Sequence, residues 1–286
     1  MTAAYFTDSC CDLPHSYAEE RDLTIVPMSY RVDGVDYVDD YGLSLSYHDF
    51  YEKLRAGIPS STSQVTSAQY EAAFTPALQA GRDVVCLAFS SALSSTYESA
   101  LLAKRNLEER YPGRSVYVID SLCASMGQGL LTHLMLNKRD EGLSTQEVVA
   151  WVEENKGRLC HWFTVDDLNH LKRGGRVSGA AAFFGTMLNI KPVLHVDDEG
   201  HLIPMEKVKG RARSVQSLFD HMKQTAQENQ TIFISHGDGE ADALRLKEMI
   251  QQEFGIQDIR INFIGPIVGS HSGPDTLALF FLGAPR

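Results

Sequence analysis

Residues 89–100 read F-S-S-A-L-S-S-T-Y-E-S-A and separate two segments of different character. The apolar run 84–88 before them is short enough to be a buried strand, and residues 96–109 after them have a helical pattern. The hydroxyl side chains that crowd this turn are Ser90, Ser91, Ser94, Ser95 and Thr96. The first N–H groups of a helix lack internal partners, so such a turn suits a bound anion. Simple N-capping by one serine explains the pattern about equally well.

The same order of strand, polar turn and helix recurs through the first half of the chain. Apolar runs at 3–7, 84–88 and 116–119 each end in polar residues and precede a helical pattern. This alternation predicts a parallel sheet covered by helices on both faces. Ligands of such sheets bind beyond the carboxyl ends of the strands, where the turns after these three runs would gather. A second hydroxyl-rich loop, S-S-T-S-Q at 60–64, is a candidate for the same edge.

The pattern changes after residue 157. Apolar segments at 190–196 and 201–208 flank D-D-E-G, a hairpin signature, and further strands and helices follow. We therefore predict an α/β protein with two domains and a ligand in the cleft between them. Residues 1–157 would form a parallel-sheet α/β domain with hydroxyl-rich loops. Residues 158–286 would form an α+β domain with a mixed or antiparallel sheet and a late loop that contains His271.

Composition excludes several classes of protein. The chain has 286 residues and a formal net charge of −11, which argues against general nucleic-acid binding because that needs a basic face. No apolar run approaches ~18 residues and the start of the chain lacks the pattern of a signal peptide, so we expect no stable membrane insertion. Five cysteines without C-x-x-C spacing indicate reduced thiols and a cytoplasmic protein.

The familiar catalytic signatures are missing from the sequence. It contains neither H-E-x-x-H nor a P-loop, and in G-R-V-S-G at 175–179 the serine stands one place too late for a nucleophile elbow. The segment H-G-D-G-E at 236–240 has metal-ligating side chains, but a polar turn after a strand explains it better. We therefore assign no catalytic residue, no metal site and no cofactor.

The remaining features suit a ligand with a carboxylate and a hydrocarbon tail. Hydroxyls and His271 can hold a carboxylate by hydrogen bonds, with added charge if the histidine is protonated. Burying about fifteen methylenes at ~0.8 kcal/mol each is worth on the order of 10 kcal/mol, against about 1.5–3 kcal/mol for a hydroxyl–carboxylate contact. An ordinary core helix is the alternative for the apolar segment, and the sequence alone favours it. The candidate acyl-chain residues are Ala182, Phe183, Thr186, Met187 and Ile190.

Ten short segments, in a fixed order along nearly the whole chain, carry a family resemblance. They are T-D-S at 7–9, D-L-P at 12–14, T-S-Q at 62–64, L-S-S-T-Y at 93–97, V-I-D-S at 118–121, G-Q-G at 127–129, L-K-R-G-G-R at 171–176, K-P at 191–192, I-G-P at 264–266 and H-S-G-P at 271–274. Together they are specific, and the chain resembles the DegV family of bacterial fatty-acid-binding proteins.

The resemblance implies two domains with one long-chain fatty acid buried between them. It implies that Thr62, Ser94 and His271 bind the ligand carboxylate. Further contacts to this group are expected from Ser63, Ser95 and Arg173. The family further implies a non-catalytic carrier that presents the carboxylate to a fatty acid kinase. The resulting acyl phosphate feeds phospholipid synthesis, and transient membrane contact is compatible with this role.

Two residues depart from the family pattern. Ser95 and Asp275 stand where glycine is usual. Ser95 would alter the geometry of the turn or add a donor. Asp275 would either raise the proton affinity of His271 or disfavour a ligand carboxylate. Two alternatives to the carrier stay open: a hydrolase or phosphotransferase that uses Ser94 and His271 on acyl substrates, and a lipid sensor that binds another protein.

Overall fold

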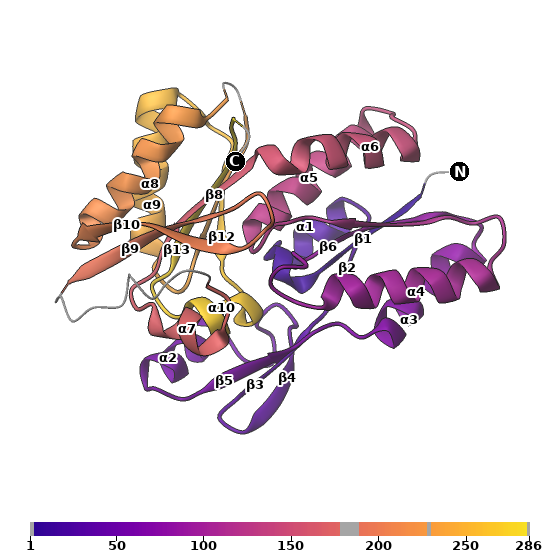
Figure 1. Cartoon of the computed structure of the whole chain (residues 1–286), viewed down its shortest axis with the longest axis horizontal. Helices are drawn as coiled ribbons and strands as arrows, with labels where there is room; N and C mark the ends of the chain where they lie inside the picture. The colour runs from indigo at the N-terminus through magenta and orange to yellow at the C-terminus, as the bar shows by residue number, and fades with distance from the viewer. Residues whose placement is uncertain (1–2, 178–188, 228–229, 285–286) are drawn as a thin grey trace.

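The computed structural model describes residues 3–177, 189–227 and 230–284, and these residues form three sheets (Figure 1). The first sheet is parallel and has the order β2-β1-β6-β7. Its strands in that order are Leu23–Val26, Ala4–Asp8, Val84–Ala88 and Val116–Asp120. β1 and β6 are buried along their whole length, which explains their continuous apolar sequence. The predicted parallel sheet of the N-terminal part is confirmed.

Helices cover this sheet on opposite sides, with α3 and α4 on one side and α5 and α6 on the other (Figure 1). The helices and short 3-10 turns of this part are η1 (Ser9–Cys11), α1 (His15–Glu20), α2 (Tyr47–Arg55), α3 (Ser67–Gln79), α4 (Thr96–Arg110), α5 (Met126–Asp140), α6 (Thr145–Asn155) and η2 (Lys156–Arg158). Thr66 and Ser144 begin α3 and α6 with complete capping boxes, so both helix starts follow from local sequence.

A second, three-stranded antiparallel sheet contains the hairpin that D-G at 33–34 predicts between the apolar segments 23–32 and 35–38, whereas its third strand, at 60–63, was not predicted. The sheet has the order β4-β3-β5, with strands Val35–Val38, Ser29–Val32 and Ser60–Ser63. The apolar segment 23–32 divides at Pro27 because proline has no N–H for a continuous ladder, so β2 and β3 enter different sheets. The expected 60–64 loop is instead largely strand β5, which pairs with β3.

The C-terminal part is built on a six-stranded sheet of order β10-β9-β8-β13-β11-β12. Its strands in that order are Leu202–Lys209, Ile190–Val196, Leu159–Thr164, Leu277–Leu282, Ile232–His236 and Ile259–Phe263. Only the β11–β12 pair is parallel, so the predicted mixed sheet is confirmed. Two helices, α8 (Arg211–Thr225) and α9 (Glu240–Phe254), pack on one face of it (Figure 1).

α5 joins the two parts, because it packs on β6 of the parallel sheet and also on β8, β11 and β13 of the mixed sheet. One apolar core therefore extends from Ala3 to Phe280. Gly127 and Gly129 permit this close packing, since a Cβ at either position would lie less than 3 Å from the opposite part of the protein or from the η1 backbone. The division into domains at residue 157 remains a prediction, although the mixed sheet does begin at Leu159.

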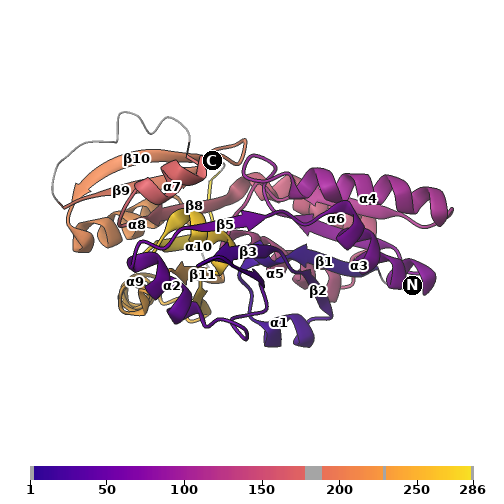
Figure 2. The ribbon, with the colours of Figure 1, turned by 90° about the horizontal axis from the view of Figure 1, so that it is seen from below.

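Two short helices complete the architecture at the junction. They are α7 (Asn169–Gly174) and α10 (Pro266–Ser272), and they pack on each other. α10 also contacts α2, β3 and β5, as Figure 2 shows from below. His271 therefore lies on a helix, and the predicted His271 loop is wrong; Pro266 at the first helical position favours this start. None of the described helices is both long enough and apolar enough to cross a membrane.

Candidate functional site

A cavity of about 480 Å³ lies where the parallel-sheet edge, the three-stranded sheet and the mixed sheet meet. The mixed sheet gives its apolar wall. His161 and Phe163 line the cavity from β8, and Ala278 and Phe280 from β13. Each pair is two residues apart, so one face of both strands lines the cavity while α8 packs on the opposite face. The volume falls in the range of small-molecule sites, about 300–1,000 Å³.

The polar wall brings together the three residues proposed for the carboxylate. The cavity is lined by Thr62 of β5, by His271 of α10, and by Ser94 of the serine turn, the segment 89–95 between β6 and α4. A hydrogen bond of 2.9 Å joins Thr62 Oγ1 to His271 Nε2 across 209 positions of sequence. These are three sources of hydrogen-bond donors on separate elements, which suits the two oxygens of a carboxylate.

His271 is neutral at neutral pH. Burial, reinforced by the nearby Arg176 guanidinium, lowers the pKa of His271 to about 4. In the ligand-free site, His271 therefore adds no positive charge at neutral pH. Positive charge comes instead from Arg176, which lines the cavity and donates from Nε to the carbonyl of Leu93 at 3.2 Å.

Carboxylates at the ends of two strands fix the serine turn. Asp8, at the end of β1, accepts a hydrogen bond from the N–H of Phe89 at 2.8 Å. Asp120, at the end of β7, accepts one from the N–H of Ser91 at 3.1 Å. The acidic residues that end neighbouring parallel strands therefore hold the turn after β6, because these strand ends share one sheet edge.

The hydroxyls of the serine turn have separate roles. Ser91, Ser94 and Ser95 line the cavity, whereas the buried Ser90 donates to the carbonyl of Gly200 at 3.2 Å. Ser94 Oγ also accepts a 3.3 Å hydrogen bond from the N–H of Thr96, at the start of α4. Ser95 is the N-cap of α4 and makes no side-chain cap hydrogen bond, so N-capping does not account for these hydroxyls.

Some of the predicted residues lie elsewhere. Ser63 is outside the described cavity wall because alternate residues of strand β5 face opposite sides, and Thr62 is the one that faces inward. Ile190 begins β9 and is also outside that wall. Arg173 is exposed, with Nη2 2.9 Å from His170 Nδ1; Arg176 supplies the arginine of the described wall. The other predicted acyl-chain residues, Ala182, Phe183, Thr186 and Met187, lie outside the described residues.

The sequence analysis did not predict several other wall residues. Ile267, Val268 and Ser272 line the cavity on the same helical face as the predicted His271, but the sequence analysis expected a loop there. Gln64 also lines it, and its Nε2 donates to Ser99 Oγ at 3.0 Å. A helix-initiating proline was the available signal for the α10 face.

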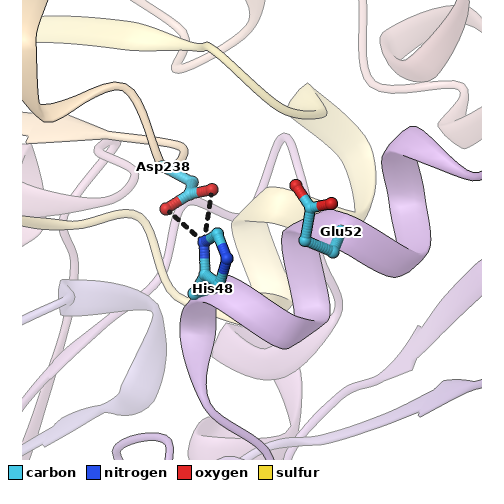
Figure 3. A group of neighbouring side chains, drawn as sticks. All are labelled: His48, Glu52 and Asp238. Carbon is cyan, nitrogen blue, oxygen red and sulfur yellow. Dashed lines mark hydrogen bonds and ion pairs between the residues drawn. The ribbon is translucent and has the colours of Figure 1, made fainter.

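Figure 3 shows a second group of polar side chains, none of which lines the cavity. His48 and Glu52 lie one turn apart on α2, and Asp238 follows β11, with candidate ligand atoms all within 4.8 Å of one another. Arg55 Nη1 lies 2.5 Å from Asp238 Oδ2 and 2.9 Å from Glu52 Oε1, and its Nη2 lies 2.9 Å from Asp275 Oδ1. The group is an ion-pair network that ties α2 to the C-terminal part, and we assign no metal to it.

The ion pair with Arg55 accounts for the aspartate at position 275, where the family usually has glycine. The residue has φ +58°, a conformation that aspartate tolerates better than most side chains. Its carboxylate pairs with Arg55, and the pKa of His271 is lowered rather than raised. Of the two alternatives for Asp275, the increase of the proton affinity of His271 is therefore wrong, and the effect on a ligand carboxylate stays a prediction.

A sequence model described as an uncharacterised protein of the DegV family matches residues 3–284. The chain belongs to the DegV family. A DegV domain-containing protein of Clostridium perfringens is 46% identical over 280 residues, which are 97% of this chain and 96% of that protein.

Among the solved structures similar to nearly the whole chain, two are informative about a ligand. A fatty-acid-binding DegV protein from Thermus thermophilus has 28% identity and a TM-score of 0.89, covering 99% of this chain and 100% of the other. The fatty acid kinase B3 protein of Streptococcus pneumoniae, loaded with linoleic acid, has 25% identity and a TM-score of 0.86, covering 99% of each chain.

Proposed function

We propose that this DegV protein binds one long-chain fatty acid in the cavity and presents its carboxylate to a fatty acid kinase. The observation that carries the proposal is the pair Thr62–His271, joined at 2.9 Å on the wall of a cavity that Ser94 and an apolar face of the mixed sheet also line. The Thermus thermophilus relative is a fatty-acid-binding protein, and the Streptococcus pneumoniae one carries linoleic acid.

The electrostatics of the site favour release of the ligand's charged end. The ligand-free site offers the carboxylate hydroxyls and an imidazole whose pKa burial lowers, with Arg176 already engaged by a backbone carbonyl. Each such contact contributes about 1.5–3 kcal/mol, whereas burial of the acyl chain contributes on the order of 10 kcal/mol. The tail therefore holds the ligand while the carboxylate stays transferable, as a kinase requires.

A carrier role fits the surroundings of Ser94 better than catalysis does. A serine nucleophile needs a general base within hydrogen-bond reach. Within the described part of the chain, Ser94 Oγ forms its hydrogen bonds with the hydroxyl and N–H of Thr96. His271 is engaged with Thr62 instead. Fatty acid kinase as the partner is proposed from the Streptococcus pneumoniae relative, whose description names that kinase.

The test is native mass spectrometry of protein purified from a bacterial host, followed by lipid extraction. We expect one fatty acid per chain, with lower occupancy in Thr62→Val and Ser94→Ala. Ser63→Ala is the matched control because it removes a hydroxyl from the next position of β5, outside the described wall. An empty wild-type protein that also fails to take up palmitic acid would reject fatty acid binding.

The kinase step needs a separate measurement. Loaded protein is mixed with ATP and the kinase of a DegV-containing bacterium, and acyl phosphate is measured. Formation that requires this protein, and that falls in Thr62→Val but not in Ser63→Ala, supports presentation. If the protein binds fatty acid but no acyl phosphate forms, the proposal of fatty acid binding would stand and the proposed presentation to a kinase would be rejected.

A further inference from the structure

Ser272, the last residue of α10, carries a buried hydroxyl that the fold does not use. The residue is 5% exposed and lines the cavity. Its Oγ forms no hydrogen bond within the described part of the chain. Neighbouring hydroxyls behave differently, since Ser270 Oγ donates to the carbonyl of Pro266 at 2.7 Å and Thr276 Oγ1 donates to that of Gly273 at 2.9 Å.

A buried polar group without a partner destabilises the folded state, because its hydrogen bonds to water are lost and no protein hydrogen bond replaces them. Alanine would avoid that cost at this position. No hydrogen bond holds the hydroxyl of Ser272 in its present rotamer. Turning Oγ about the Cα–Cβ bond therefore sacrifices no contact of this kind, and it gains one if the cavity holds a hydrogen-bonding atom.

The position of Ser272 indicates which part of a ligand it would meet. Ile267, Val268, His271 and Ser272 form the face of α10 that lines the cavity. His271 and Ser272 are consecutive residues of the last turn, with His271 on the flank that reaches Thr62. A ligand whose carboxyl group lies at His271 therefore passes Ser272 close to that same end.

We propose that Ser272 is a further ligand-binding residue, whose hydroxyl hydrogen-bonds a carboxylate oxygen of the bound acid. This inference rests on the proposed function. It adds a second contact from α10 to the carboxylate, beside that of His271. It also explains why a hydroxyl is present at a position where the ligand-free fold does not use one.

The test compares Ser272→Thr with Ser272→Val. The two side chains have nearly the same shape and fill the cavity equally, but only threonine keeps a hydroxyl. Affinity for palmitic acid is measured by titration calorimetry after delipidation, and 3-hydroxypalmitic acid serves as the second probe. Ser270→Ala controls for changes within α10, because the Ser270 hydroxyl is bonded to the helix backbone.

We expect the valine variant to bind palmitic acid about tenfold more weakly than the threonine variant, as for loss of one hydrogen bond to a charged group. Ser270→Ala should bind like the wild type. In addition, ligand-free Ser272→Ala should melt no lower than ligand-free wild type, because no protein hydrogen bond is lost. A residue with a purely structural role would lower the melting temperature instead.

Equal palmitic acid affinities of the threonine and valine variants, with normal binding by the wild type, would overturn the Ser272 contact and leave the proposed function intact. A difference seen only with 3-hydroxypalmitic acid would also overturn it, because the hydroxyl would then contact the chain rather than the carboxylate. Failure of the wild type to bind either acid would reject the proposed function itself.

Discussion

Gly174, the last residue of α7, touches the imidazole of His271 so closely that no larger side chain fits. A Cβ at this position would lie 2.3 Å from His271 Nδ1 and 3.2 Å from its Cγ. Ordinary contact begins near 3.4 Å, so Gly174→Ala requires a relative movement of about 1 Å between α7 and the ring. We predict that this substitution impairs fatty acid binding although Gly174 is not part of the described cavity wall.

The magnitude follows from the Thr62–His271 hydrogen bond. Hydrogen bonds of this kind tolerate about 0.5 Å around their usual length, so a 2.9 Å contact does not survive a 1 Å shift of the ring. Loss of one histidine contact to a carboxylate is worth about 1.5–3 kcal/mol, which lowers affinity roughly 10- to 150-fold. The assay is titration of delipidated protein with palmitic acid, alongside thermal melting of the ligand-free protein.

Gly255→Ala, at the C-cap of α9 and outside the described cavity wall, is the matched control. Gly255 has φ +67°, so alanine costs about 1–2 kcal/mol of folding stability, but its Cβ would meet no atom within 4 Å. This variant should melt a few degrees lower and bind normally. Wild-type affinity in Gly174→Ala would refute the reasoning. An equal loss of affinity in Gly255→Ala would show that lowered stability, and not the contact with His271, reduces binding.

Three further predictions concern stability. Burial raises the pKa of Asp39 to about 7, so between about pH 4 and pH 7 the folded state keeps a proton that the unfolded state releases. The stability of Asp39→Asn relative to wild type should therefore increase as pH rises, by up to roughly 4 kcal/mol at about pH 8. A pH-independent difference in urea unfolding would contradict this. Arg55→Met should lower the free energy of unfolding by about 1–2 kcal/mol, because three carboxylates lose their shared cation. This decrease, measured by urea unfolding, should be smaller in high salt. A decrease that does not depend on salt would indicate lost packing instead. Asp12 accepts hydrogen bonds from the N–H of Gly265 at 2.9 Å and from Ser125 Oγ at 2.5 Å. Asp12→Ala should therefore melt several degrees below Asp12→Asn, which keeps an acceptor. Equal melting temperatures would exclude a stabilising role of these two hydrogen bonds.

Local sequence was sufficient for the parallel sheet and its turns. Strand, turn and helix signals there lie within about twenty residues of one another, as in β6, the serine turn and α4. The capping boxes of α3 and α6 are equally local. The mixed C-terminal sheet also followed from its hairpin. The strand β5 was missed because S-S-T-S has no apolar alternation, and its strand conformation depends on pairing with β3.

Some residues of the candidate site were likewise predicted from sequence, and others were not. Thr62, Ser94 and His271 came from family motifs, and the structure brings all three to one cavity. Arg176 was passed over in favour of Arg173, since motif spacing does not tell which arginine of a turn faces inward.

What the sequence determined by itself was therefore the order of the elements, the hydroxyl-rich strand ends and the membership of a family. Only the tertiary structure decided that burial lowers the pKa of His271, that Asp275 pairs with Arg55, and that the buried hydroxyl of Ser272 has no hydrogen-bond partner among the described residues. The physical reason is that local patterns depend on covalent neighbours and on the periods of helix and strand. Burial, charge state and cavity shape depend instead on side chains up to about two hundred positions apart, as Thr62 and His271 are.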